Sequence, residues 1–142
     1  NRFAHSLDEP MASVNLHEML DLMTCLAQRT ASVRGVTLQT RKAEPHPVIR
    51  VAPFGLETLI WLCLDVGMSA KLTEKTLTIG ADLEKTGARI RFGGFQGLGE
   101  FRENDASVRK LDALAQAVGA VVSLDEENKE IVLSLLQDAG GR

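Results

Sequence analysis

The stretch from Pro53 to Ala70, PFGLETLIWLCLDVGMSA, is the longest strongly apolar run of the chain, and Glu57 and Asp65 are its only charged residues. Its apolar residues recur at three- and four-residue steps, the period of one helix face. A helix that is apolar nearly all round is buried on several sides, in a protein core or in a membrane. About twenty uninterrupted apolar residues are needed to span a bilayer, and two carboxylates interrupt this run. The stretch therefore predicts the central buried helix of a soluble domain, with its core stripe formed by Leu56, Leu59, Ile60, Cys63 and Val66.

A second helix is predicted between Asn15 and Gly35. Asn15 is a good N-cap, and Glu18 three residues later completes a variant of the capping box. Gly35 is the natural C-terminal stop, because glycine readily takes the left-handed conformation found there. One face of this helix is apolar and is expected to face the core; it comprises Leu16, Met19, Leu20, Met23, Leu26, Ala27 and Val33.

Alternating apolar and polar residues predict strands in the rest of the chain. A third helix is expected to begin at Asn104 or Asp105 and to end at Gly119. Strands with one wet face, together with helices that cover the other face, make a two-layer α/β sandwich. The predicted strands are 36–40, 48–51, a hairpin of 76–83 with 88–92, whose buried face includes Leu83, and a final hairpin of 120–124 with 131–136.

Composition limits the classes of partner. The formal net charge is −3 and aromatic residues make up only 4% of the chain, so neither electrostatic attraction nor base stacking favours a nucleic acid. The same charge gives no reason to expect contact with an anionic membrane. Cys25 and Cys63 fall on the apolar sides of predicted helices, which is typical of reduced cysteines in a cytosolic protein. With no signal peptide or membrane-spanning run, we expect a cytoplasmic location.

The titratable residues offer few catalytic candidates. His17 and His46 are predicted to be solvated surface residues. His5 has the His-x-x-x-x-Pro spacing of a phosphorylated histidine box, but that box requires a long helical hairpin, and the next predicted helix begins within a few residues. Glu57 and Asp65 lie on one side of the central helix and are interpreted as its solvent edge rather than as paired catalytic carboxylates. No zinc-binding motif is present, so no metal site is predicted.

Several local phrases, in a fixed order, resemble the ATP-binding domain of sensor histidine kinases, which has the Bergerat fold. Residues 14–20, VNLHEML, are similar to the opening of that family's first helix, and residues 34–38, RGVTL, are similar to its entry into the first strand. Residues 52–57, APFGLE, stand where the family has Asp-Pro-x-x-Leu. Residues 108–111, VRKL, and 118–120, VGA, match its final helix and closing strands. The resemblance implies three helices over one face of a mixed, largely antiparallel sheet.

The residues that perform the family's chemistry are replaced in this chain. The family's central helix carries Asn-x-x-x-Asn-Ala, which serves magnesium and phosphate, and the alignment places Leu62, Val66 and Gly67 there. Neither Leu nor Val offers oxygen to a hard cation. The family's Asp-x-Gly-x-Gly supplies a carboxylate to adenine, whereas this chain has Gly93-Gly94-Phe95-Gln96-Gly97. The degenerate pocket positions are therefore Leu62, Val66, Gly94, Gly97 and Gly99.

The resemblance implies a role in two-component signalling without ATP binding. We expect no catalytic residue and no cofactor, and a scaffold that docks on its own dimerisation helices, in a homodimer, and on a response-regulator receiver domain. Two alternatives remain: an active kinase domain that binds ATP and magnesium through divergent motifs, with Asp65 serving the metal, and the supporting domain of a histidine phosphotransferase.

The domain boundaries follow from the same resemblance. Residues 1–13 are expected to be the tail of a preceding dimerisation helix or a linker, residues 14–138 the ATPase-like domain, and residues 139–142 a C-terminal tail. In the domain, the lid is nearly deleted, and we expect the loop 93–103 to fold inward and close the former site with Phe95, Leu98 or Phe101.

Overall fold

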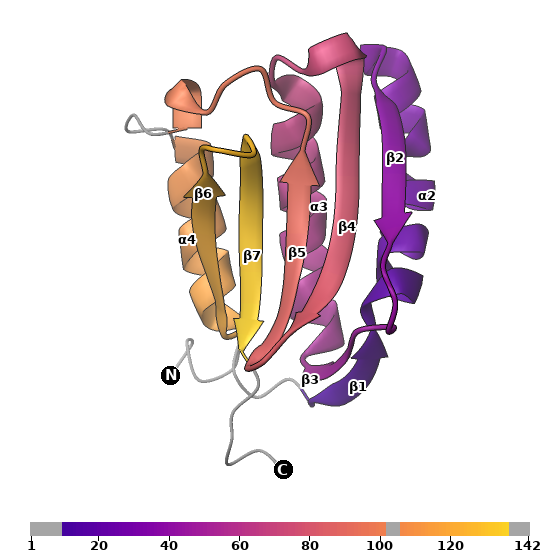
Figure 1. Cartoon of the computed structure of the whole chain (residues 1–142), viewed down its shortest axis with the longest axis vertical. Helices are drawn as coiled ribbons and strands as arrows, with labels where there is room; N and C mark the ends of the chain where they lie inside the picture. Colours follow the sequence, from indigo (N-terminus) through magenta and orange to yellow (C-terminus); the bar gives the residue numbers. More distant parts are fainter. Residues whose placement is uncertain (1–9, 102–105, 137–142) are drawn as a thin grey trace.

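The computed structural model describes residues 10–101 and 106–136, which form a two-layer sandwich. The main sheet has the strand order β2-β4-β5-β7-β6, in which β2 and β4 are parallel and all other neighbours are antiparallel. Three helices lie together behind this sheet, with α3 in the middle (Figure 1). The fold predicted from the sequence is therefore confirmed. The elements are α2 (Leu16–Arg34), α3 (Pro53–Ser69), α4 (Ala106–Ala117), β2 (Thr37–Lys42), β4 (Thr76–Glu84), β5 (Gly87–Gly93), β6 (Ala120–Asp125) and β7 (Glu130–Leu136).

Helix α2 begins and ends at the predicted residues. The side chain of Asn15 accepts hydrogen bonds from the backbone N–H groups of His17 and Glu18, and Gly35 closes the helix in the left-handed conformation. The predicted apolar face is only partly right, because Leu26 is 60% exposed and Val33 is 82% exposed. The core stripe instead follows Leu16, Leu20, Met23, Ala27 and Ala31, at steps of three and four residues.

Helix α3 is the central helix of the core. Pro53 occupies its first turn, as predicted, and its buried stripe follows Leu56, Leu59, Ile60, Cys63 and Gly67. A Cβ atom at Gly67 would lie 2.8 Å from both methyl groups of Leu77, so the glycine lets α3 approach β4 closely. Val66, which the sequence analysis places on the core stripe, is half-buried beside it.

One small sheet is not predicted by the sequence. Strand β1 (Ala12–Asn15) pairs antiparallel with β3 (Val48–Val51), apart from the main sheet. β1 is too short and too mixed in polarity to show an alternating pattern. The N–H of Leu16 donates to the carbonyl of Pro47, 2.9 Å away, so the pairing continues into the first residue of α2.

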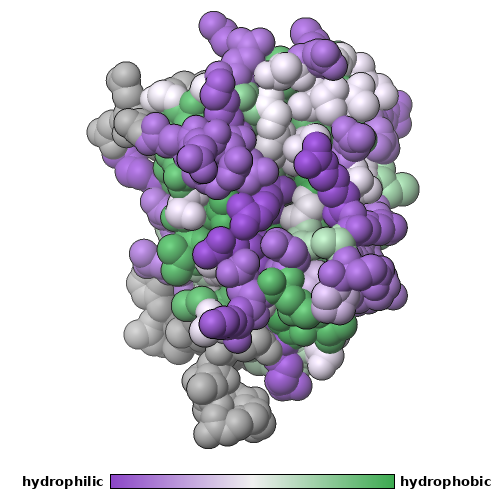
Figure 2. Space-filling model, viewed as in Figure 1, coloured by the Kyte–Doolittle hydropathy of each residue, from purple (hydrophilic) through white to green (hydrophobic). Residues whose placement is uncertain are grey.

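The face of the main sheet opposite the helices is polar over much of its area (Figure 2). Two further expectations about side-chain burial are wrong. Leu83, at the end of β4, is 42% exposed, and Cys25 is exposed on α2 whereas Cys63 is buried. The expected cap at Asn104 or Asp105 and the expected role of His5 fall outside the described residues. No helix among the described residues is long and apolar enough to cross a membrane.

Candidate functional site

The degenerate pocket positions on α3 carry only hydrocarbon. Leu62 and Val66 are half-buried and pack against the hydrophobic core. They lie one turn apart on the helix, so both point to the same flank. A hard cation such as Mg²⁺ requires oxygen ligands, which neither side chain possesses. This flank of α3 therefore offers no side-chain ligand for magnesium at the two positions where the resemblance places it.

Gly94 is required by backbone packing. Its φ is +102°, and a Cβ atom would lie 2.3 Å from the carbonyl oxygen of Thr76. That carbonyl belongs to β4, so only glycine permits this close approach of the loop to the strand. The carbonyl of Gly94 is itself occupied, since it accepts a hydrogen bond of 2.8 Å from the N–H of Thr73. Gly97 and Gly99 differ, because a Cβ atom at either position would meet nothing within 4 Å.

The loop after β5 folds inward, as predicted. Phe95, Leu98 and Phe101 are buried, with 2–5% of their surfaces exposed. The rings of Phe95 and Phe101 meet edge to face, with centroids 5.3 Å apart. The backbone is also fixed, since Phe95 bridges to Leu72 and the N–H of Gln96 donates to the carbonyl of Lys71. The loop that follows β5 is thus held in place by its buried apolar side chains and by its backbone hydrogen bonds.

The two carboxylates of α3 do not form a pair. A carboxylate oxygen of Asp65 forms an ion pair with the guanidinium of Arg34, with an N–O distance of 3.0 Å. The same guanidinium donates a hydrogen bond of 2.8 Å to the hydroxyl of Ser69. Both partners are partly exposed, so the prediction of a solvent-edge charge for Asp65 is confirmed. Among the described residues, no group of three His, Cys, Asp or Glu side chains is arranged to hold a metal ion.

The prediction of a solvated His17 is wrong. His17 is 3% exposed, its Nε2 lies 3.3 Å from the carbonyl oxygen of Ala81, and its Nδ1 lies 3.1 Å from Nδ1 of His46. His46 is exposed, as predicted. The sequence does contain a signal for the burial of His17, because His17, Thr24 and Ala31 recur at seven-residue steps along one flank of the buried face. The first turn of α2 is thereby joined to β4.

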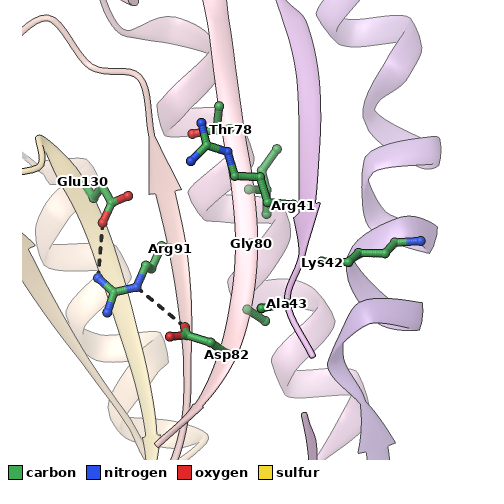
Figure 3. Close-up of a pocket in the computed structure, with 10 residues that line it drawn as sticks. Arg41, Lys42, Ala43, Thr78, Gly80, Asp82, Arg91 and Glu130 are labelled. Carbon is green, nitrogen blue, oxygen red and sulfur yellow. Dashed lines mark hydrogen bonds and ion pairs between the residues drawn. The ribbon is translucent and has the colours of Figure 1, made fainter. Parts of the chain in front are cut away.

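The open face of the sheet carries a charged cluster that is not among the sequence-based predictions. Arg91 lies 3.2 Å from Glu130, 3.6 Å from Asp82 and 3.9 Å from Asp125. A cavity of about 240 Å³ lies beside it over Gly80, and Arg41 extends along its other side (Figure 3). The guanidinium of Arg91 on β5 thus contacts carboxylates on β4, β6 and β7. The sequence signal for this cluster is the set of charged residues Asp82, Arg89 and Arg91, which the alternating pattern of the hairpin places on its solvent-exposed face.

Comparisons with known proteins give a structural match only. No family model matches the sequence, and no curated protein matches it either. The cytoplasmic segment of histidine kinase QseC is 16% identical, with a TM-score of 0.64 over 90% of this chain and 79% of that one. The ATP-binding domain of PrrB from Mycobacterium tuberculosis is 17% identical, with a TM-score of 0.68 over 91% of this chain and 98% of that one.

A third solved structure agrees. The nucleotide-free catalytic domain of histidine kinase ThkA is 9% identical, with a TM-score of 0.70 over 87% of this chain and 92% of that one. The three matches cover between 87% and 91% of this chain. The chain therefore has the fold of the ATP-binding domain of histidine kinases.

Proposed function

We propose that this chain is a histidine-kinase-like domain of two-component signal transduction that keeps the ATPase fold, does not bind magnesium ATP, and acts in the cytoplasm as a scaffold. The observation that supports this most is the apolar flank of α3, where Leu62 and Val66 pack against the core. The burial of Phe95, Leu98 and Phe101 supports it further, since their loop fills space with hydrocarbon instead of presenting polar groups to a nucleotide. Gly94 serves backbone packing rather than phosphate contact.

An active domain with divergent motifs is less well supported. That alternative relies on Asp65 as the magnesium ligand, and Asp65 is engaged by Arg34 of α2. A carboxylate held by a guanidinium would have to exchange that partner for the metal. The phosphotransferase alternative relies on an acceptor histidine on a helix upstream of this domain, and His5, which has the spacing of such an acceptor, lies outside the described residues.

A scaffold needs a surface for a partner, and the helical layer offers apolar side chains in solvent. Phe54 is 72% exposed on α3, and Leu26 and Val33 are exposed on α2. Exposed apolar groups of this kind are typical of protein contact surfaces when they gather on one side of a molecule. We propose that the partners are the dimerisation helices of the same protein, in a homodimer, and a response-regulator receiver domain. Sedimentation of the chain mixed with a receiver domain tests the second contact, and unchanged sedimentation at high concentration of both would contradict it.

Calorimetry with ATP and magnesium tests the loss of nucleotide binding. We expect no magnesium-dependent saturable heat and no magnesium-dependent rise in melting temperature at millimolar nucleotide, because a ligand that binds only the folded state raises stability with its concentration. The PrrB domain, whose name describes it as ATP-binding, is a positive control under the same conditions. Saturable binding that is lost in Val66→Arg, a change that fills this flank of α3, would overturn the proposal.

A further inference from the structure

A second cavity lies at the C-terminal end of the central helix α3, where Ser69 and Ala70, one turn beyond Val66, line it. It measures about 360 Å³ and lies where the C-terminal ends of α2 and α3 meet the segment that leads into β4. Three of its lining residues are cations, two more carry uncharged polar groups, and the remainder are apolar. The charged and polar residues are Arg34, Lys71, Lys75, Ser69 and Gln96.

The charges of this cavity are unbalanced. None of its lining residues, all of them described, carries a carboxylate. The positive charge of Arg34 is neutralised in part by Asp65, whose carboxylate lies 3.0 Å from the guanidinium. Lys71 and Lys75 are exposed and form no ion pair with any described residue. The cavity is therefore lined by two lysines that have no ion-pair partner among the described residues, together with one arginine.

The backbone that brings Lys75 to the cavity is strained. Glu74 and Lys75 are consecutive and both left-handed, with φ of 53° and 50°. For a residue with a Cβ atom this conformation costs about 1–2 kcal/mol, and such outliers concentrate at functional sites. The turn is held by two hydrogen bonds, from the hydroxyl of Thr76 to the carbonyl of Glu74 at 3.0 Å and from the N–H of Lys75 to the carbonyl of Leu72 at 3.4 Å. Of the two strained residues, the cation lines the cavity and the anion does not.

The floor of the cavity is fixed by the loop after β5. The N–H of Gln96 donates to the carbonyl of Lys71 at 3.0 Å, and its side-chain amide donates to the carbonyl of Leu72 at 3.3 Å. The hydroxyl of Ser69 is held by Arg34. The polar groups are thus positioned before any ligand arrives, which lowers the entropic cost of binding one.

We propose that this cavity binds a small molecule through a phosphate group, held between Lys71 and Lys75 with Arg34 behind them. Lysine binds phosphate as a point charge, and the guanidinium of Arg34, whose terminal nitrogens are engaged by Asp65 and Ser69, adds positive charge behind the two lysines. The apolar wall, formed by Val36, Met68 and Leu72, receives the uncharged part of the ligand. The volume is within the usual range for small-molecule sites, which is about 300–1,000 Å³.

The test is a titration of the full chain with inorganic phosphate and pyrophosphate at constant ionic strength, followed by backbone amide chemical shifts. We expect saturable shifts confined to residues 69–75 and 96, tighter for pyrophosphate, and no saturation with acetate. Linear drift with concentration, or shifts centred elsewhere, would overturn the proposal.

Two glycine variants separate the effect of the charge of Lys75 on binding from the effect of backbone strain at residues 74 and 75. Lys75→Gly and Glu74→Gly both place glycine at a left-handed position, so both raise the melting temperature. Only Lys75→Gly removes a cation, and we expect it to weaken pyrophosphate binding by about tenfold, the effect of 1.4 kcal/mol, while Glu74→Gly binds at least as well as the parent. Equal affinity in the two variants would overturn the assignment of Lys75 to phosphate binding.

The same variants keep this proposal distinct from the loss of the nucleotide site. ATP itself carries phosphate, so weak ATP binding that does not need magnesium and is lost in Lys75→Gly belongs to this cavity. ATP binding that survives Lys75→Gly and shifts the amides around Leu62 and Val66 would instead overturn the proposed function.

Discussion

The guanidinium of Arg34 lies 3.0 Å from the carboxylate of Asp65 and joins the C-terminal end of α2 to α3. The same guanidinium donates to the hydroxyl of Ser69, so α3 is held at two positions one turn apart. Both charged side chains are more than a third exposed. The pair therefore fixes how two neighbouring helices align, while water screens much of its energy.

We expect Asp65→Ala to lower the free energy of unfolding by about 0.2–1 kcal/mol, because partly exposed ion pairs contribute little. The loss should shrink in 1 M salt, which reduces the screening length to about 3 Å. Urea unfolding at low and high salt measures both values. The double variant with Arg34→Ala should lose less than the sum of the single variants; strict additivity would mean that the two side chains do not interact in solution.

Leu59→Ala should destabilise the domain by about 2–5 kcal/mol, since it removes a fully buried side chain and leaves a cavity in the core. Leu59 has no exposed surface on α3. The matched control is Leu26→Ala on α2, where the same atoms are removed from a side chain that is 60% exposed. Denaturant unfolding should show a change within about 0.5 kcal/mol for the control. Similar losses in both variants would contradict the placement of the core.

Phe95→Ala should lower stability by about 3–5 kcal/mol, the usual effect of deleting a buried aromatic ring. Phe95 is 2% exposed and meets Phe101 edge to face. A double-variant cycle with Phe101→Ala should give a coupling energy of about 0.5–1.5 kcal/mol. If Phe95→Ala left the melting temperature unchanged, the loop after β5 would not be folded inward in solution.

Gly94→Ala and Gly97→Ala should change the free energy of unfolding by amounts that differ in sign or size. At Gly94 a Cβ atom would lie 2.3 Å from a backbone oxygen and φ is +102°, so we expect a loss of more than about 1 kcal/mol. At Gly97 a Cβ atom meets nothing within 4 Å, so alanine should be neutral or stabilising by up to about 1 kcal/mol. Thermal unfolding of the two variants decides this, and comparable losses would show that Gly97 also has a steric role.

The two thiols should react at very different rates with a disulfide reagent. Burial raises the pKa of the Cys63 thiol well above its ordinary value, and the thiolate is the reactive form. Cys25 is exposed on α2. We expect one thiol to react quickly in the folded protein and the second only in denaturant, with the fast phase absent from Cys25→Ser. A fast reaction of both thiols would indicate that α3 opens readily.

The sequence by itself determined the order of the elements from α2 to β7 and most of their bounds. Signals of this kind are local: the cap at Asn15, the stop at Gly35, Pro53 at the first turn of α3, and the alternation through β4 and β5. Each depends on backbone geometry within a few residues, so no distant contact is needed to interpret it. The chemical nature of the candidate site was local in the same sense, because Leu62 and Val66 are hydrocarbon in any fold.

Only the tertiary structure decided which side of α2 is buried. Leu26 and Val33 lie on an apolar pattern yet remain exposed, because the sheet meets α2 along Ala27 and Ala31 instead. His17 is buried because β4 supplies the carbonyl of Ala81, which is distant in sequence. The cavity around Lys71 and Lys75 likewise joins three segments that share no local motif. Burial and charge balance depend on what packs opposite a residue, and that partner is set by the topology of the sheet.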